Sequence, residues 1–285
     1  MTISLPSKWV KKNNLKSGDE LELAEQDDNL VVSAERKEVV RTFQFDAATK
    51  GVMTNRAILQ AYLLGYDEIK ISYTDPLALT KIKKIVPELI GFEIIQESTK
   101  SCTLKELTGI NQLEFDSIFR RLFRIIAGIS EESGSAVEKN DRAMLENLIS
   151  RDIDVNKFSN LCVRYLNKVG HPETERTSAY LILCQNLERI GDGYKEILRY
   201  MMENDKKMSE EYLKIFKKIN SLFAKCYEYT FELKNEKAIE IASLFESLNK
   251  EIDGKNFGDL RLMSQMKSLL RDVITIVGLQ AAFSN

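Results

Sequence analysis

Glu188 and Asp192 stand four positions apart in the stretch Leu-Glu-Arg-Ile-Gly-Asp, beside the apolar stripe of a long predicted helix. Asp152 and Asn156 have the same spacing in the predicted helix before it. Side chains four residues apart lie on one face of a helix. A lone carboxylate is costly to bury, so acids beside a packed helix seam are paired, protonated or bound to a metal ion. Their oxygen atoms suit Mg²⁺ or Mn²⁺, with iron as a further candidate.

A short break at His171-Pro172 separates these two helices, which are predicted over 138–169 and 172–202. Helices joined by a short connection pack antiparallel, and this brings the two polar pairs level with each other. We therefore expect one metal site, formed by Asp152, Asn156, Glu188 and Asp192. The alternative is an ion-pair network that joins the same acids to Arg151, Arg164 and Arg189.

The region from 109 to 285 has apolar residues at helical spacing almost throughout. Its predicted helices cover 113–130, 138–169, 172–202, 208–231, 236–252 and 259–282. They suggest two three-helix bundles in tandem, 109–203 and 204–285. In the second bundle the positions of Glu188 and Asp192 are taken by Leu270 and Ile274, so we expect an apolar core without a metal there.

Residues 38–108 alternate between strand and helix patterns. The predicted strands cover 39–45, 68–73, 92–97 and 102–107, and the predicted helices cover 55–64 and 77–90. The stretch lacks a glycine-rich phosphate loop. We expect an α+β connecting module that supports a dimer, with a small-molecule sensor as the alternative.

Residues 1–37 read as short strands joined by turns, such as the one at Gly18-Asp19. A unit this small buries too little surface alone, which favours a homodimer. Its lysines, Lys8, Lys11, Lys12 and Lys16, predict contacts to DNA phosphates. The alternative is a solvated helix face on a dimerisation module. Together with the other regions, this predicts a multi-domain, mainly α-helical protein.

The composition excludes several classes of protein. The 41 basic and 43 acidic residues nearly balance, which is not typical of a chain that binds nucleic acid along its whole length. His171 is the single histidine, so a His-rich zinc site is excluded. No apolar run is long enough to span a membrane, and the four separated cysteines predict reduced, buried thiols in a cytoplasmic protein. Neither nucleophile nor general base accompanies the acids, so we do not expect an enzyme.

The N-terminal stretch contains the motifs Ile-Ser-Leu-Pro-x-x-Trp-Val and Leu-Lys-x-Gly-Asp-x-Leu-x-Leu within roughly its first 35 residues. It resembles the AbrB/SpoVT swapped-hairpin domain. The resemblance implies an intertwined dimer that commonly binds DNA.

The motif Leu-Glu-Arg-Ile-Gly-Asp, preceded by Arg-Asp-x-x-Val-Asn, resembles the PhoU family over residues 109–285. The pairing with an AbrB-like domain resembles archaeal phosphate-uptake regulators. This implies metal binding through facing acid pairs, often with iron or zinc, and repression of phosphate uptake through a transporter or sensor partner. Asn156 stands where the family has an aspartate, so we expect weaker metal binding. The alternative function is a protein that docks on a phosphate transporter or sensor without touching DNA.

Overall fold

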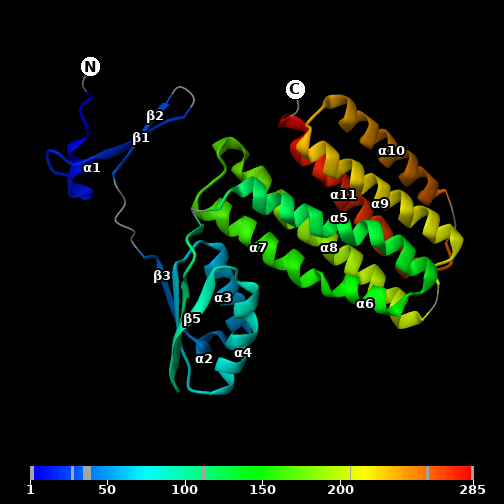
Figure 1. Ribbon diagram of the computed structural model, residues 1–285, viewed down its shortest axis with the longest axis horizontal. Coiled ribbons are helices and arrows are strands. Elements are labelled where there is room, and N and C mark those ends of the chain that lie inside the picture. The colour runs from blue at the N-terminus through cyan, green and yellow to red at the C-terminus, as the bar shows by residue number, and fades with distance from the viewer. Residues whose placement is uncertain are drawn as a thin grey trace. The chain divides into compact units, whose positions relative to one another are not determined.

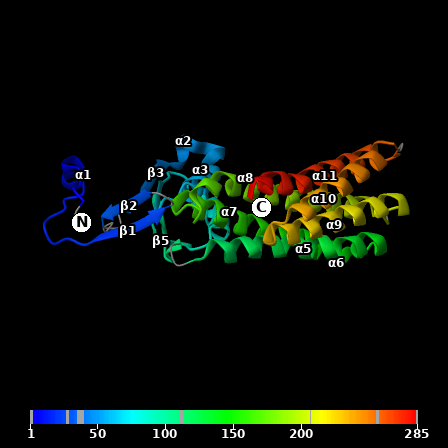
Figure 2. The same ribbon diagram turned by 90° about the horizontal axis from the view of Figure 1, so that it is seen from above.

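The computed structural model describes residues 3–26, 29–34, 40–110, 113–205, 207–254 and 257–283. Its contacts divide the chain into two compact units, Met1–Arg41 and Thr42–Asn285. The predicted boundary at residues 37 and 38, and the predicted start of a strand at residue 39, lie outside the described residues. Figures 1 and 2 show the elements in two views.

The N-terminal unit contains a short helix, α1 (Ser7–Lys12), and an antiparallel hairpin of β1 (Leu21–Gln26) and β2 (Asn29–Ala34). None of the side chains described in this unit is buried. Leu23 and Leu30 keep 64% and 43% of their surface exposed. The side chains described in one copy of this unit therefore do not form a hydrophobic core.

The second unit begins with an α+β region, as predicted. Its elements are β3 (Thr42–Asp46), α2 (Ala47–Lys50), α3 (Thr54–Leu63), β4 (Glu68–Ser72), α4 (Leu77–Ile85), β5 (Phe92–Glu97) and β6 (Ser101–Glu106). The sheet has the order β3-β4-β6-β5, with β3 parallel to β4 and the other pairs antiparallel. Along β4, Ile69 and Ile71 point into the core while Lys70 points away, because side chains alternate along a strand.

The rest of the second unit is helical. Its helices are α5 (Phe115–Lys139), α6 (Arg142–Ser150), α7 (Asp152–Lys168), α8 (Thr177–Asn204), α9 (Glu210–Phe231), α10 (Asn235–Asp253) and α11 (Leu260–Gln280). They run side by side in both views (Figures 1 and 2). Helix α5 packs against α7, α8 and α9, and α8 also packs against α11. The two halves of the helical region therefore share one continuous core.

Two helix boundaries differ from the prediction. The first helix continues to Lys139 instead of ending at 130, and Asn140 ends it with a left-handed φ of 52°. The second helix, predicted as continuous over 138–169, is interrupted at Arg151. The Arg151 guanidinium donates to both carboxylate oxygens of Glu132 on α5, at 2.7 and 2.9 Å. This tertiary ion pair is not encoded in the local apolar pattern. Asp152 follows the interruption directly and lies in the first turn of α7.

The four cysteines are buried and free, as the sequence predicted. Burial raises the pKa of the Cys102 thiol to about 11 and that of Cys226 to about 12. These thiols are therefore protonated side chains of the core.

Candidate metal site between α7 and α8

The two predicted polar pairs lie on neighbouring helices. Asp152 and Asn156 occupy the first two turns of α7, and Glu188 and Asp192 lie in the middle of α8. The two helices pack directly against each other. A Cβ atom on Gly191 would lie 2.8 Å from Cγ1 of Val155, so the glycine lets α8 approach α7 closely at this level.

Lys195 lies between acids of the two helices. Its Nζ atom donates to Asp152 Oδ2 at 2.9 Å and also to Asp192 Oδ1. The Lys195 side chain is only 16% exposed. Burial lowers the pKa of its ammonium, but the hydrogen bonds to Asp192 and Asp152 outweigh this, so the pKa of Lys195 lies above its ordinary value. Lys195 is therefore a charged link between α7 and α8.

Glu188 belongs to the same electrostatic cluster. Burial raises the pKa of its carboxyl group, and the neighbouring charges of Asp192 and Asp152 raise it further. The structure thus brings Asp152, Glu188 and Asp192 together around Lys195, and Asn156 lies one turn further along α7. We call these five residues the acid cluster.

Two oxygen atoms of the acid cluster are buried without a hydrogen-bond partner among the described residues, Asp152 Oδ1 and Asn156 Oδ1. Buried polar atoms are normally satisfied, so such atoms indicate a missing ligand, water or ion. Both are hard oxygen donors of the type that binds divalent cations. The donor set therefore fits a metal ion in its chemistry.

The side chains are nevertheless arranged so that a metal ion cannot bind without a rearrangement. Within the part of the chain that the structure describes, no group of three or more His, Cys, Asp or Glu side chains is arranged to hold a metal ion. Lys195 occupies oxygens of two of the predicted ligands. A metal ion could reach these oxygens only after the ammonium group moved away.

The arginines of the alternative prediction pair elsewhere. Arg151 binds Glu132, and Arg189 lies 3.5 Å from Asp272 on α11. Arg164, three turns further along α7, is buried, binds Glu106 and donates to the carbonyl oxygen of Tyr62. Arg189 also lies near enough to Glu188 to lower the pKa of its carboxyl group, but the direct ion pairs to acids of the two helices come from Lys195. Lys195 could have been found from its position three residues after Asp192, a spacing that brings side chains together on a helix.

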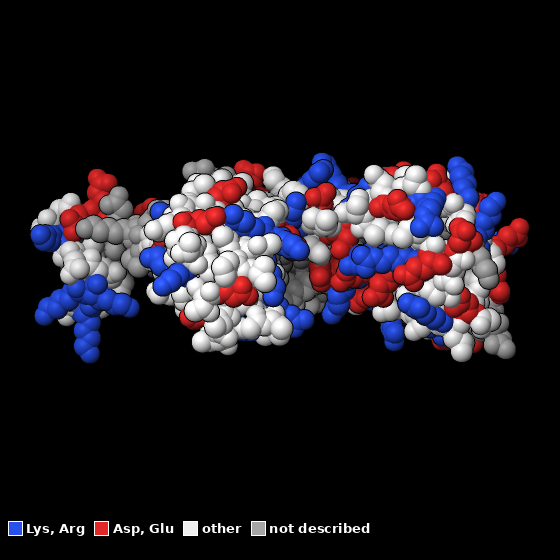
Figure 3. Space-filling model, turned by 90° about the horizontal axis from the view of Figure 1, so that it is seen from below, with Lys and Arg blue, Asp and Glu red and all other residues white. Residues whose placement is uncertain are grey.

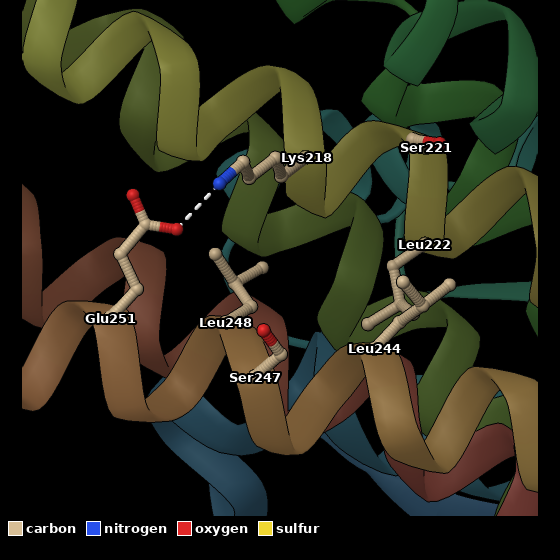
Figure 4. A pocket seen from close by; sticks show the side chains of 7 residues that line it. All are labelled: Lys218, Ser221, Leu222, Leu244, Ser247, Leu248 and Glu251. Carbon is tan, nitrogen blue, oxygen red and sulfur yellow. Dashed lines mark hydrogen bonds and ion pairs between the residues drawn. The ribbon is translucent and has the colours of Figure 1, made fainter.

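Two cavities in the helical region lie away from the acid cluster. One of about 170 Å³ opens between α9 and α10, where Lys218 pairs with Glu251 beside Leu222, Leu244 and Leu248 (Figure 4). The other, of about 680 Å³, lies between α5 and α9. Neither is lined by a residue of the acid cluster.

The predicted DNA-binding lysines are exposed. Lys8, Lys11 and Lys12 lie on α1, and Lys16 follows in the turn that Asp19 stabilises by accepting the Lys16 amide hydrogen at 2.6 Å. Figure 3 shows basic side chains gathered on this part of the N-terminal unit. Their exposure leaves both sequence interpretations open, phosphate contacts and a solvated face.

Residues 119–201 match the family model described as the PhoU domain. The chain contains a PhoU domain. The match runs from α5 to α8 and includes the acid cluster. The resemblance seen in the sequence covers a longer range, 109–285. Residues 2–39 match the model for antidote-toxin recognition MazE, a bacterial antitoxin. No curated protein and no solved structure matches the chain. Among the described residues, no helix of this PhoU-domain protein is long and apolar enough to span a membrane.

Proposed function

We propose that this protein regulates phosphate uptake. The observation that carries the proposal is the PhoU domain match over the helices that hold the acid cluster. A PhoU domain supports a role in phosphate homeostasis, and the N-terminal domain is compatible with DNA binding. Both domain families are regulatory, which fits a protein without catalytic activity. Regulation is negative in this proposal, and it takes place in the cytoplasm. Deletion of the gene should therefore raise phosphate uptake in phosphate-rich medium.

The regulator acts as a homodimer. The absence of buried side chains among those described in the N-terminal unit supports this, because Leu23, Leu30 and Val31 would be covered by a second copy. Size-exclusion chromatography with light scattering should give twice the mass of the chain. A monomer at micromolar concentration would contradict a dimer formed through this unit.

Binding to DNA uses Lys8, Lys11, Lys12 and Lys16 on the N-terminal unit. Because such contacts release counterions, affinity should fall steeply with salt. Gel shifts with the region upstream of a phosphate-transporter gene should show this, and replacing the four lysines by alanine should abolish the shift. No shift in low salt would favour the second candidate, a protein that docks on a phosphate transporter or sensor without DNA.

The acid cluster holds one divalent cation in this proposal, Mg²⁺, Mn²⁺, iron or Zn²⁺. Asp152, Asn156, Glu188 and Asp192 are its ligands, and the unpartnered oxygens of Asp152 and Asn156 support the assignment. The divalent ion would join α7 to α8 and offset two of the three carboxylate charges. Elemental analysis of the wild type beside Glu188→Ala/Asp192→Ala tests this. Unchanged metal content would leave these acids with a structural role only.

A further inference from the structure

The ammonium group of Lys195 lies where the acid cluster offers most negative charge. It binds one oxygen of Asp152 from α7 and one of Asp192 from α8. Both acids are among the four proposed metal ligands. A divalent cation coordinated by these oxygens would lie next to the ammonium group. Two neighbouring cations repel each other strongly in a partly buried site.

We infer that Lys195 is an internal cation that competes with a divalent metal ion for Asp152 and Asp192. The inference rests on the metal site of the proposed function and adds a residue that sets its affinity. A metal ion enters when the ammonium group leaves, and the ammonium group returns when the metal ion dissociates. Lys195 is thus a residue that controls metal binding without being a ligand.

The geometry of Lys195 allows this exchange. The side chain starts from α8 one turn beyond Asp192 and is partly exposed, so its flexible four-carbon stem can carry the charge into solvent. The donors that remain do not depend on Lys195. Asp152 Oδ1 and Asn156 Oδ1 have no hydrogen-bond partner in the described structure, and the Glu188 carboxyl group lies within the field of the other two acids.

The exchange also explains why the acids are tolerated when no metal is bound. Three carboxylates that share a partly buried site repel one another, and the ammonium group offsets one of their charges. A protein with Lys195 in place remains folded without metal, whereas a protein without it depends more strongly on the ion.

The test compares wild type with Lys195→Met and Lys195→Arg in titrations with Mn²⁺ and with Zn²⁺ at fixed pH. Losing charge-assisted hydrogen bonds on metal entry weakens wild-type binding, so Lys195→Met should bind about ten- to a hundred-fold more tightly. Lys195→Arg keeps the positive charge and should remain close to wild type. Lys225→Met serves as the matched control, because Lys225 forms an exposed ion pair with Glu240 far from the acid cluster.

Thermal unfolding gives a second readout that does not depend on regulation. In EDTA, Lys195→Met should melt below wild type, because its acids have lost their counter-charge. Added Mn²⁺ should raise its melting temperature by more than that of wild type. Circular dichroism before the titration establishes that each variant is folded, and Lys195→Gln replaces Lys195→Met if the latter is not.

Equal or weaker metal binding by the folded Lys195→Met variant would overturn the inference. If the wild type still binds one metal ion that Glu188→Ala/Asp192→Ala loses, the proposed metal site stands and only the competition is wrong. If neither wild type nor Lys195→Met binds either ion, the metal site itself is wrong, and the inference fails with it.

Discussion

Helix α8 contributes to two contacts of opposite character. Toward α7 it presents Glu188, Asp192 and Lys195, and toward α11 it presents Gly193 against the Leu269 side chain. On α11 the positions that correspond to Glu188 and Asp192 are Leu270, which is fully buried, and Ile274. The same helix thus borders a charged seam and a mainly apolar contact, in which the half-exposed Arg189 side chain pairs with Asp272 of α11. In both contacts the charged side chains have a counter-charge, whereas the two positions that correspond to Glu188 and Asp192 hold apolar side chains.

The acids of the second half confirm this contrast. Glu240 on α10 pairs with Lys225 at the surface and stays 57% exposed, so it does not face the core. Leu270 lies in the continuous hydrophobic core. These described residues of the second half therefore do not form a counterpart of the acid cluster.

Leu270→Glu should give the largest effect, because it puts a carboxylate into the apolar core without a cation. Breaking a buried charge pair costs about 3–5 kcal/mol, and an unpaired buried glutamate should cost about as much. Chemical denaturation measures the free energy of unfolding. Leu270→Met, which conserves volume, should cost less than about 1.5 kcal/mol. A small effect of Leu270→Glu would mean that the two contacts of α8 differ less than their residues suggest.

The two glycines of α8 allow a more local comparison. A Cβ at position 191 would lie 2.8 Å from the stiff, buried Val155, whereas a Cβ at 193 would lie 3.3 Å from the end of the flexible Leu269 side chain. Gly191→Ala should therefore cost about 1–3 kcal/mol through overpacking. Gly193→Ala should be neutral or stabilising by up to about 1 kcal/mol, because alanine favours the helix. Equal effects on the melting temperature would show that the α7 contact is no tighter than the α11 contact.

The sequence predicted most of what depends on local spacing. The strands and helices of the α+β region, the facing polar pairs and the apolar second half all follow from periodicity. The break at Arg151 and the burial of Arg164 were missed, because each depends on a partner distant in sequence, Glu132 and Glu106. Lys195 was missed for another reason. Its spacing from Asp192 is visible in the sequence, but the sequence does not show which of the nearby cations, Lys195 or the arginines, turns toward the acids.

Asp259 gives a third prediction, because it is the N-cap residue of α11 and its carboxylate has hydrogen-bond partners. It caps the helix by accepting the Leu262 amide hydrogen at 3.0 Å, and it accepts the Tyr200 hydroxyl hydrogen at 2.6 Å. Burial opposes ionisation, but these hydrogen bonds hold the pKa of Asp259 below its ordinary value. Asp259→Ala should cost about 1 kcal/mol at neutral pH.

The pH dependence of that loss has a definite sign. A lowered pKa stabilises the folded state above the ordinary pKa of an aspartate, and this stability is lost as pH falls through the lowered value. The difference between wild type and Asp259→Ala should therefore shrink in acid. A difference that is constant with pH in urea unfolding would assign the effect to packing instead of to the carboxylate.

The pKa of Glu188 is shifted in the opposite direction from that of Asp259, so its stability should depend on pH in the opposite way. Of the four predictions, this one has the smallest expected effect on stability. Burial and the charges of Asp192 and Asp152 raise its pKa, so the folded protein holds the proton more tightly than the unfolded chain does. The resulting stability is present at low pH and is lost as pH rises through the raised pKa. Glu188→Gln is neutral at every pH and should remove this loss.

The measurement compares melting temperatures in EDTA, so that metal binding does not contribute. Glu188→Gln should melt close to wild type near about pH 4 and above it near about pH 7.5. Glu240→Gln, which alters an exposed ion pair on α10, should not show a gain that grows with pH. If Glu188→Gln melts below wild type at the higher pH, a partner in the acid cluster stabilises the glutamate carboxylate. The repulsion among the three carboxylates at the α7–α8 contact would then be weaker than proposed.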